Sequence, residues 1–275
     1  MTPLLSTPAL SVGEFHCPPG DASWHETNRI GDRAHVVFPR RSVLIRQLGR
    51  EPVLATPNHA MLYNADQHYR RELHHELGDD SVFVELPAAT LEQLAGDRRL
   101  HATHVPAGRR TYLLQHLLVR QLRGRLCDEL EAEELASRLV LSALASDAAR
   151  RRPARERTSV DHRELAEAAK SEIASDLSVR RSLGELARTL HTSPFHLARV
   201  FRAETGFTLA GYRQALRLRA ALERLPGNDR DLCSLALELG FSSHSHFTAS
   251  FTREFGVAPS AVKDPRRLRD LLDAA

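Results

Sequence analysis

The stretches LARTLHTSPFHLARVFRAETG (186–206) and LALELGFSSHSHFTASFTREFGVAPS (235–260) carry one pattern written twice, about fifty residues apart. Each copy has apolar residues at helical spacing, a short polar turn with a serine, and a second apolar stripe that ends at a glycine. The pattern predicts two helix-turn-helix units. The duplication therefore predicts two recognition helices, the second helix of each unit, offered to the major groove of DNA.

Capping residues mark where the helices of each copy begin. Ser182 and Asp231 precede the first helix of the two copies, and a side-chain oxygen at such a position accepts a free backbone N–H. Ser193 and Ser243 precede the second helices in the same way. Pro194 stands at the first helical position, where its missing N–H has no cost. The recognition helices are therefore expected over residues 194–205 and 244–255.

Two longer helices frame the duplicated units. Asp161 is expected to cap a helix that runs to about Leu177. Residues 208–225 carry an apolar stripe and are followed by Pro226-Gly227-Asn228, which predicts a joining helix. At the helical rise this joining helix spans about 27 Å. It is long enough to hold two recognition helices about one turn of DNA, ~34 Å, apart.

The outward face of each recognition helix supplies the candidate DNA contacts. Arg199 is expected to read a base edge and Phe195 to contact a thymine methyl. Arg202 and nearby helix N-terminal amides are expected to hold phosphate. For one helix alone, solvated arginines are an equal alternative, and the duplication favours DNA. The candidate DNA-binding residues are Ser193, Phe195, His196, Ala198, Arg199, Arg202, Ser243, His244, Ser245, Thr248, Ala249 and Thr252.

The two half-motifs, and above all the A…GF.S.S.F…F…FG..P pattern of the second, resemble the DNA-binding domain of the AraC/XylS family of transcription regulators. The resemblance covers Leu183–Pro259 and implies seven helices over residues 158–265. Ala249 stands where the family often has arginine, which implies more phosphate contact than base readout in the second unit. Leu209 replaces a usual proline and Val262-Lys263 a common Tyr-Arg pair. The resemblance implies base-reading positions at Phe195, Ala198, Arg199, Ser243, His244, Ser245, Thr248 and Ala249.

The first part of the chain reads as short strands and turns. Brief runs rich in β-branched and aromatic residues alternate with Pro, Gly, Asn and Asp, which predicts a mainly-β sandwich or small barrel. The order of Cys17, Trp24, Phe38-Pro39, Asn58, Tyr63-Asn64, Tyr69-Arg70 and Gly78-Asp79 resembles the cupin-like sensor halves found in one branch of the same family. The expected strands are 35–39, 42–48, 53–56, 60–63 and 81–86.

From Arg109 the apolar period becomes helical, with two stripes that Gly124 separates. We expect an antiparallel helix pair that forms core or a dimer interface. The charged stretch 150–157 is expected to be a solvated linker, with a phosphate-binding arm as the alternative. The expected domains are a cupin-like sensor (1–107), a helical pair (108–149), a charged linker (150–160) and an all-α DNA-binding domain with two helix-turn-helix motifs joined by a long helix (161–265).

Composition agrees with a nucleic-acid module attached to another domain. Residues 151–275 carry 21 Lys and Arg against 16 Asp and Glu, a net charge of +5, while residues 1–150 carry 17 against 19, a net charge of −2. The three cysteines are far apart and predict neither a disulfide framework nor a zinc site. Because no signal peptide or apolar run of about 20 residues is present, we expect a cytoplasmic protein with no membrane partner.

Histidines are frequent in the N-terminal half, and His68, His74, His75 and Glu76 raise the question of a metal site. Adjacent residues of a strand point to opposite faces, so His74 and His75 do not form a ligand pair there. His244 and His246 lie two apart on a helix and do not share a face. No motif of an enzyme active site appears. We therefore expect no metal, no cofactor and no enzymatic activity.

The function predicted is a sequence-specific, one-component transcription regulator of the AraC/XylS type. Its expected partners are double-stranded promoter DNA, a small-molecule effector in the N-terminal domain, RNA polymerase and a second copy of the chain. Activation is expected because it is the commoner role in the resembled family. Two alternatives stay open: a metal-dependent cupin enzyme fused to a DNA-binding tail, and a constitutive DNA-binding protein whose N-terminal half only oligomerises.

Overall fold

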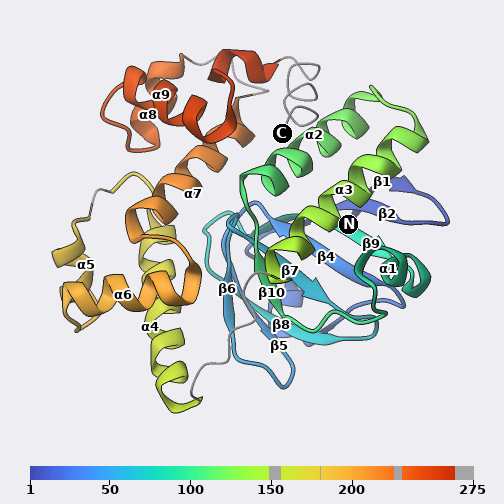
Figure 1. Ribbon diagram of the computed structural model, residues 1–275, viewed down its shortest axis with the longest axis horizontal. Helices are drawn as coiled ribbons and strands as arrows, with labels where there is room; N and C mark the ends of the chain where they lie inside the picture. Colours follow the sequence, from blue (N-terminus) through green and yellow to red (C-terminus); the bar gives the residue numbers. More distant parts are fainter. Residues whose placement is uncertain (149–155, 180, 226–230, 264–275) are drawn as a thin grey trace. The chain divides into compact units, whose positions relative to one another are not determined.

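The computed structural model describes residues 1–148, 156–179, 181–225 and 231–263. The chain divides into two compact units, a first unit within residues 1–150 and a second unit within residues 151–263. The first is rich in strands and the second is helical, as the sequence predicts (Figure 1). Among the described residues, no helix is both long enough and apolar enough to span a bilayer.

The first unit is built on two antiparallel sheets. One sheet has the order β1-β2-β9-β4-β7-β10 and the other the order β3-β8-β5-β6. Apolar side chains on their facing sides form much of the core, which includes Val43, Ile45 and Met61. The bounds are β1 (Thr2–Ser6), β2 (Ser11–Cys17), β3 (Asn28–Arg29), β4 (Ala34–Pro39), β5 (Val43–Gln47), β6 (Val53–Ala55), β7 (His59–Tyr63), β8 (His68–Leu73), β9 (Asp79–Leu86) and β10 (His104–Pro106).

The five expected strands correspond to β4, β5, β6, β7 and β9 within a residue or two at each end. The sequence analysis missed β1, β2, β3, β8 and β10, together with helix α1 (Ala88–Ala95). β8 reads HYRREL and buries one residue of six, Arg71, so its inward face does not stand out in hydropathy. In β2, Gly13 faces Phe83 of β9, and a side chain on Gly13 would collide with that ring.

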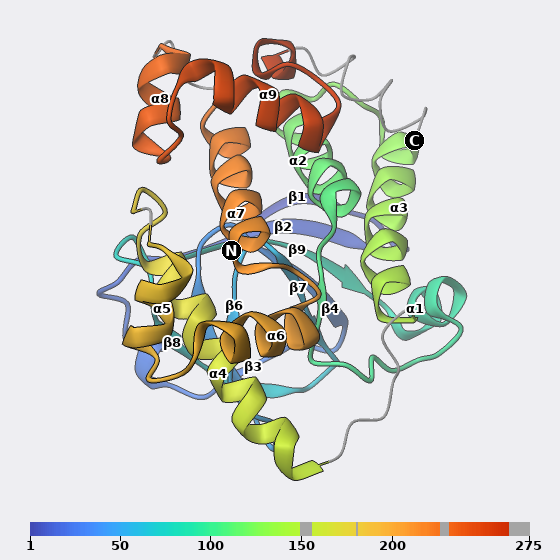
Figure 2. The same cartoon turned by 60° about the vertical axis from the view of Figure 1, so that its left-hand side comes forward.

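The expected helix pair is present as α2 (Arg109–Gly124) and α3 (Glu129–Ala148), which pack on each other (Figures 1 and 2). Gly124 is the last residue of α2, and the left-handed residue that ends the helix is Arg125, at φ 52°. Helix α2 is buried from Thr111 to Val119, so it belongs to the core of the first unit. On α3, Leu130 and Leu141 are exposed, so this helix keeps an apolar part of its surface outside the core of the first unit.

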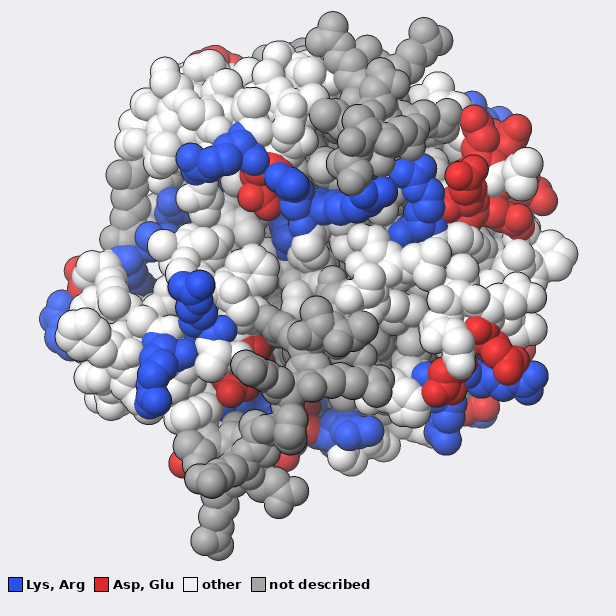
Figure 3. Space-filling model, viewed as in Figure 1, with Lys and Arg blue, Asp and Glu red and all other residues white. Residues whose placement is uncertain are grey.

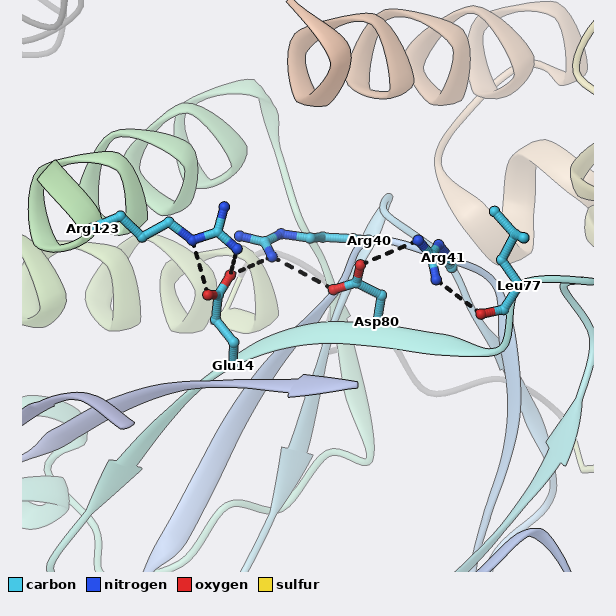
Figure 4. Close-up of polar contacts among 6 residues, drawn as sticks. All are labelled: Glu14, Arg40, Arg41, Leu77, Asp80 and Arg123. Carbon is cyan, nitrogen blue, oxygen red and sulfur yellow. Dashed lines mark hydrogen bonds and ion pairs between the residues drawn. The ribbon is translucent and has the colours of Figure 1, made fainter. Parts of the chain in front are cut away.

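A chain of ion pairs fastens α2 to the outer side of the larger sheet (Figure 4). Arg123 of α2 makes a bidentate contact with Glu14 of β2, with N···O distances of 3.0 and 2.8 Å. The same carboxylate accepts from Arg40, which also contacts Asp80 of β9 at 3.5 Å. Arg41 continues the chain from Asp80 to the carbonyl of Leu77. These contacts fix the C-terminal end of α2 relative to β2 and β9.

The second unit contains six α-helices and a closing 3-10 helix in its described residues. Helices α4 and α6 pack side by side, and α7 contacts α4, α6 and α9 (Figures 1 and 2). The last helix of the seven implied by the resemblance is thus a 3-10 helix, η2. The bounds are α4 (Glu156–Ser175), α5 (Leu183–Thr189), α6 (Pro194–Thr205), α7 (Leu209–Arg224), α8 (Leu232–Glu238), α9 (His244–Phe255) and η2 (Pro259–Lys263).

The start of α4 differs from the prediction. The helix begins at Glu156, so Asp161 lies inside it rather than at its N-cap, and residues 156–160 of the expected linker are helical. Because the helix already runs through Thr158, Ser159 and Val160, the backbone N–H groups after Asp161 bond within the helix and do not need its side chain. The rest of the expected linker and the stop signal Pro226-Gly227-Asn228 lie outside the described residues.

Candidate nucleic-acid interface

The first recognition helix is α6, and it has the bounds that the sequence predicts. Ser193 caps it, with its hydroxyl 3.2 Å from the backbone N of His196. Leu197, Val200 and Phe201 are fully buried and hold the helix against α4 and α7. On the outside, 89% of Phe195 is exposed, a large apolar side chain with no core to fill.

Two histidines position the arginine that the sequence singles out. The ring of His196 packs edge-on against His162 of α4, with centroids 5.5 Å apart. Arg199 Nη2 lies 3.3 Å from His196 Nδ1, a hydrogen-bonding distance. Arg199 and Arg202 are exposed on the outward face. The His162 contact was not foreseen, because nothing in the sequence pairs α4 with α6.

The second recognition helix, α9, also has the predicted bounds, with Ser243 as its cap. Phe247, Phe251 and Phe255 form its buried stripe, and adjacent rings contact each other edge to face. From His244 to Thr252 the outward face offers hydroxyl, imidazole and methyl groups. The two recognition helices therefore share a core pattern and differ in surface chemistry.

The cap serines donate their O–H to no acceptor in the part of the chain that the structure describes. Ser193 and Ser243 each accept a backbone N–H, at 3.2 and 3.1 Å. A hydroxyl has one O–H to donate beside its acceptor lone pairs. Both serines are exposed at a helix N-terminus, where the partial positive charge of the helix favours an anion. The arrangement suits a DNA phosphate at each N-terminus.

One buried arginine ties the second recognition helix to the rest of the unit. Arg217 of α7 donates to the carbonyls of Leu177 at 2.6 Å and Gly240 at 3.0 Å, with longer contacts to Ser178 and Val179. Gly240 has φ 75°, and an added Cβ would lie 2.6 Å from the Arg217 guanidinium. The arginine thus joins the end of α4 to the turn before α9. Sequence reasoning missed it because an arginine in a helix is normally exposed.

Charge is uneven over the face of the second unit shown in Figure 3. Lys and Arg side chains lie on its surface around α5 and α6, whereas the surface over α8 and α9 is mostly uncharged. Among the residues that the structure describes, no three His, Cys, Asp or Glu side chains gather as a ligand set.

Comparisons with known proteins identify the second unit. Residues 186–264 match a family described as "Helix-turn-helix domain". The probable transcription factor PqrA of Proteus vulgaris is 33% identical over 78 residues, which are 28% of this chain and 64% of that protein. The regulator RipA of Corynebacterium diphtheriae is 37% identical over 82 residues, 30% of this chain and 24% of the relative. The activator RhaR of Yersinia pseudotuberculosis is 31% identical over 88 residues, 30% of each chain.

These alignments span less than two thirds of each of the three relatives, and all three are named as regulators of transcription. Among solved structures, an AraC-type regulator from Chromobacterium violaceum is 23% identical, with a TM-score of 0.36 over 39% of this chain and 96% of that one. ToxT from Vibrio cholerae is 12% identical, with a TM-score of 0.38 over 93% and 95%.

The capped helix pairs and the family match define a helix-turn-helix DNA-binding domain. Within that class, the second unit of this chain is similar to the DNA-binding domains of transcription regulators such as PqrA, RipA and RhaR. The resemblance stated from the sequence is thereby confirmed.

Proposed function

We propose that this chain is a sequence-specific transcription regulator whose α6 and α9 enter the major groove as the recognition helices of two helix-turn-helix units. The observation that carries the proposal is the duplication itself: both helices start at a serine cap, bury the same stripe and leave their opposite faces exposed. A helix face that contacted only water would not require the same serine cap and the same buried stripe in both units. Helix α7, with 16 residues or about 24 Å of rise, would hold the two units apart.

The two helices would divide the work of DNA recognition. On α6, Arg199 would read a guanine edge, Phe195 would contact a thymine methyl and Arg202 would hold phosphate. The exposed ring of Phe195 favours that role, because burial against a methyl group recovers its hydrophobic free energy. On α9, short hydroxyl and imidazole groups would contact base edges along the groove. Ala249 would form no hydrogen bond to the base that it faces.

Selection of random duplexes by the full-length protein at two salt concentrations tests the proposal. We expect an enriched site with two short blocks about one helical turn apart. On that site, Arg199→Ala should cost about 1–3 kcal/mol and relax preference at one base. Arg202→Ala should weaken all duplexes equally and lower the salt slope by about 0.9. Binding without any enriched sequence would contradict the proposal.

We further propose that the first unit is a cupin-like sensor domain that biases this DNA-binding domain in the cytoplasm. Its two antiparallel sheets support that assignment. Activation through RNA polymerase is proposed because relatives such as RhaR are named activators. In-vitro transcription from a promoter bearing the selected site tests this step, and reduced transcript on addition of the protein would make it a repressor.

A second copy of the chain would contact α3. Leu130 and Leu141 are exposed there, and a separation of 11 residues is just over three full turns, so both lie on one face of the helix. This exposed pair supports the proposal of a homodimer.

A further inference from the structure

The first unit holds a cavity of about 200 Å³ between its two sheets. Its lining side chains come from β2, β4, β7 and β9 of the larger sheet and from β5, β6 and β8 of the smaller one. On β9 the lining residues are Asp79, Ser81, Phe83 and Glu85, every second residue of the strand. Since alternate residues of a strand share a face, the inward faces of the strands form the wall of the cavity.

The volume limits the size of an occupant. A cavity of about 150 Å³ lined by apolar side chains is known to take up benzene. A cavity of about 200 Å³ therefore fits one ring with a substituent. Drug-sized ligands and nucleotides need pockets of about 300 Å³ or more. The occupant is thus a single-ring molecule or an aliphatic of equal volume.

Most of the wall is apolar, which sets the body of the occupant. Phe15, Val43, Ile45, Met61 and Phe83 line the cavity from both sheets. Burying an apolar ring against them is favourable at roughly 25 cal/mol per Å². A sugar of the same volume would bury several hydroxyls without partners on these side chains, at a cost for each. The wall therefore selects a mainly apolar molecule.

One end of the cavity is polar, and its hydroxyls lack partners. Tyr63 and Tyr69 both line the cavity, with ring centroids 5.1 Å apart. Neither hydroxyl has a hydrogen bond to any residue that the structure describes. Burial raises the pKa of Tyr63 well above its ordinary value, so the hydroxyl is neutral and keeps its proton. Because these hydroxyls face the cavity, each can exchange a hydrogen bond with a polar group of a ligand bound there.

The charged side chains along the wall already contact an ionisable partner within the described part of the chain. Asp79 lies 3.6 Å from Arg71, and Glu85 lies 3.0 Å from His35. At the exposed rim, Arg29 pairs with Asp66 at 2.6 Å. A charged ligand would bring an uncompensated charge into a buried site, which is strongly unfavourable. The pairing therefore selects an uncharged occupant.

We propose that this cavity binds an uncharged molecule the size of one aromatic ring, whose hydroxyl exchanges hydrogen bonds with Tyr63 and Tyr69. The inference rests on the proposed regulator in one respect, that the bound molecule acts as its effector. It assigns the binding site, the ligand class and the two residues that read the head group.

Binding to the full-length protein is measured by calorimetry with three probes of one size: phenol, benzene and benzoate. Phenol should bind about tenfold more tightly than benzene, the worth of one hydrogen bond, and benzoate should not bind. Tyr63→Phe should abolish the preference for phenol and leave benzene binding intact. Ala55→Leu, which adds side-chain volume to the wall, should weaken both neutral probes. Equal binding of phenol and benzene, or tight binding of benzoate, overturns the proposal.

Tyr112→Phe is the matched control, since Tyr112 is buried in α2 of the same unit and does not line the cavity. It should leave the phenol-to-benzene ratio unchanged. If Tyr63→Phe fails to fold, Tyr69→Phe tests the same hydroxyl pair. A ratio that falls equally in Tyr112→Phe would show a general loss of packing and overturn the assignment.

DNA binding is measured separately, on the selected duplex with and without phenol. A change in DNA affinity on adding phenol, absent in Tyr63→Phe, supports the effector role. Phenol binding with unchanged DNA affinity overturns that role and leaves the cavity as a binding site. Failure to bind any specific duplex contradicts the proposed function alone, because the calorimetry needs no DNA.

Discussion

Arg217 shows how a single buried side chain fixes the position of a helix within its unit. Its guanidinium has several donors in a fixed fork, and it donates to carbonyls in the segment that follows α4 and in the turn before α9. Leu177 lies just beyond α4 and Gly240 just beyond α8, outside the helical hydrogen-bond pattern. The arginine supplies a donor to both segments at once. The position of α9 on its unit therefore depends on a residue that touches no DNA.

Replacing Arg217 by methionine keeps much of the volume and removes the donors. We expect a loss of about 2–4 kcal/mol in the free energy of unfolding, because several part-buried carbonyls lose their charged donor at once. Urea denaturation of the full-length chain measures it. Arg224→Met is the control: Arg224 lies on the same helix, is half exposed and pairs with Glu238 at 3.6 Å, so it should cost below about 1 kcal/mol. Equal losses in the two variants would refute the role given to Arg217.

Asp79 gives the first unit a pH dependence of defined sign. Burial raises the pKa of its carboxyl from 3.8 to about 6, against the opposing effect of Arg71. Between these two values the folded state binds a proton that the unfolded state has released. The contribution of Asp79 to stability is therefore full below about pH 4 and is lost as pH rises through about 6. The loss is at most about 3 kcal/mol, since one pKa unit corresponds to about 1.4 kcal/mol.

Asp79→Asn removes this titration while keeping the shape of the side chain. We expect the free energy of unfolding of the natural protein, minus that of the variant, to fall between pH 4 and 6 and to stay level above about pH 7. Asp97→Asn is a control, because Asp97 is half exposed and its hydrogen bond with His101 lowers its pKa, so the corresponding difference should not fall between pH 4 and 6. A difference that rises with pH would show that pairing with Arg71 outweighs burial.

At the scale of elements, α6 and α9 share one backbone and core pattern and carry different surface residues. Both end at a left-handed glycine, Gly206 at φ 79° and Gly256 at φ 78°. Their turns also match, since His191 and Gly240 take positive φ at equivalent places. The surfaces differ: Arg199 and Arg202 lie on the outward face of α6, whereas the outward face of α9 from His244 to Thr252 carries short neutral groups and its arginine, Arg253, lies in the last turn. The shared backbone and core pattern positions each helix, and the exposed residues would determine which bases it contacts.

Ala249→Arg tests that division. The new guanidinium on α9 should strengthen binding to every duplex and raise the salt slope by about 0.9, the value of one added phosphate contact. Titration of the selected and a scrambled duplex at two salt concentrations measures both effects. Gln93→Arg adds the same charge to an exposed position of α1 in the other unit and should change neither slope nor affinity beyond screening. An unchanged slope in Ala249→Arg would place this face of α9 away from DNA.

The features predicted correctly from the sequence depend on interactions between residues that are close together in the chain. Caps and apolar periodicity act within one helix, so Ser193 and Ser243 placed both recognition helices correctly. The sequence also indicated the strands with continuous apolar runs. Contacts between distant segments leave no such local signal, and so β8, the His162 contact and the Arg217 contacts were missed. The candidate DNA contacts stay predictions, because their partner is a second molecule.

At the scale of the whole molecule, strand β9 links two features of the first unit. Asp79 faces the cavity, while the next residue, Asp80, holds Arg40 and Arg41 on the outer side of the sheet. Adjacent residues of a strand point to opposite faces. A shift of β9 on ligand binding would therefore reach the ion pairs that fasten α2, the helix packed on α3. The same helix pair carries the proposed dimer contact.

That contact makes a prediction about the size of the protein in solution. Leu130 and Leu141 expose apolar surface on one face of α3, and burial against a second copy would recover its hydrophobic free energy. We expect a dimer in sedimentation equilibrium, and a monomer when both leucines are replaced by glutamate. Leu48→Glu, at an exposed leucine just after β5, should leave the dimer intact. The monomeric double variant should still bind a single selected site, because α6 and α9 belong to one chain, and should lose cooperative binding to paired sites. A natural protein that sediments as a monomer at micromolar concentration would leave α3 without this role, and the first unit would then act on the second within one chain.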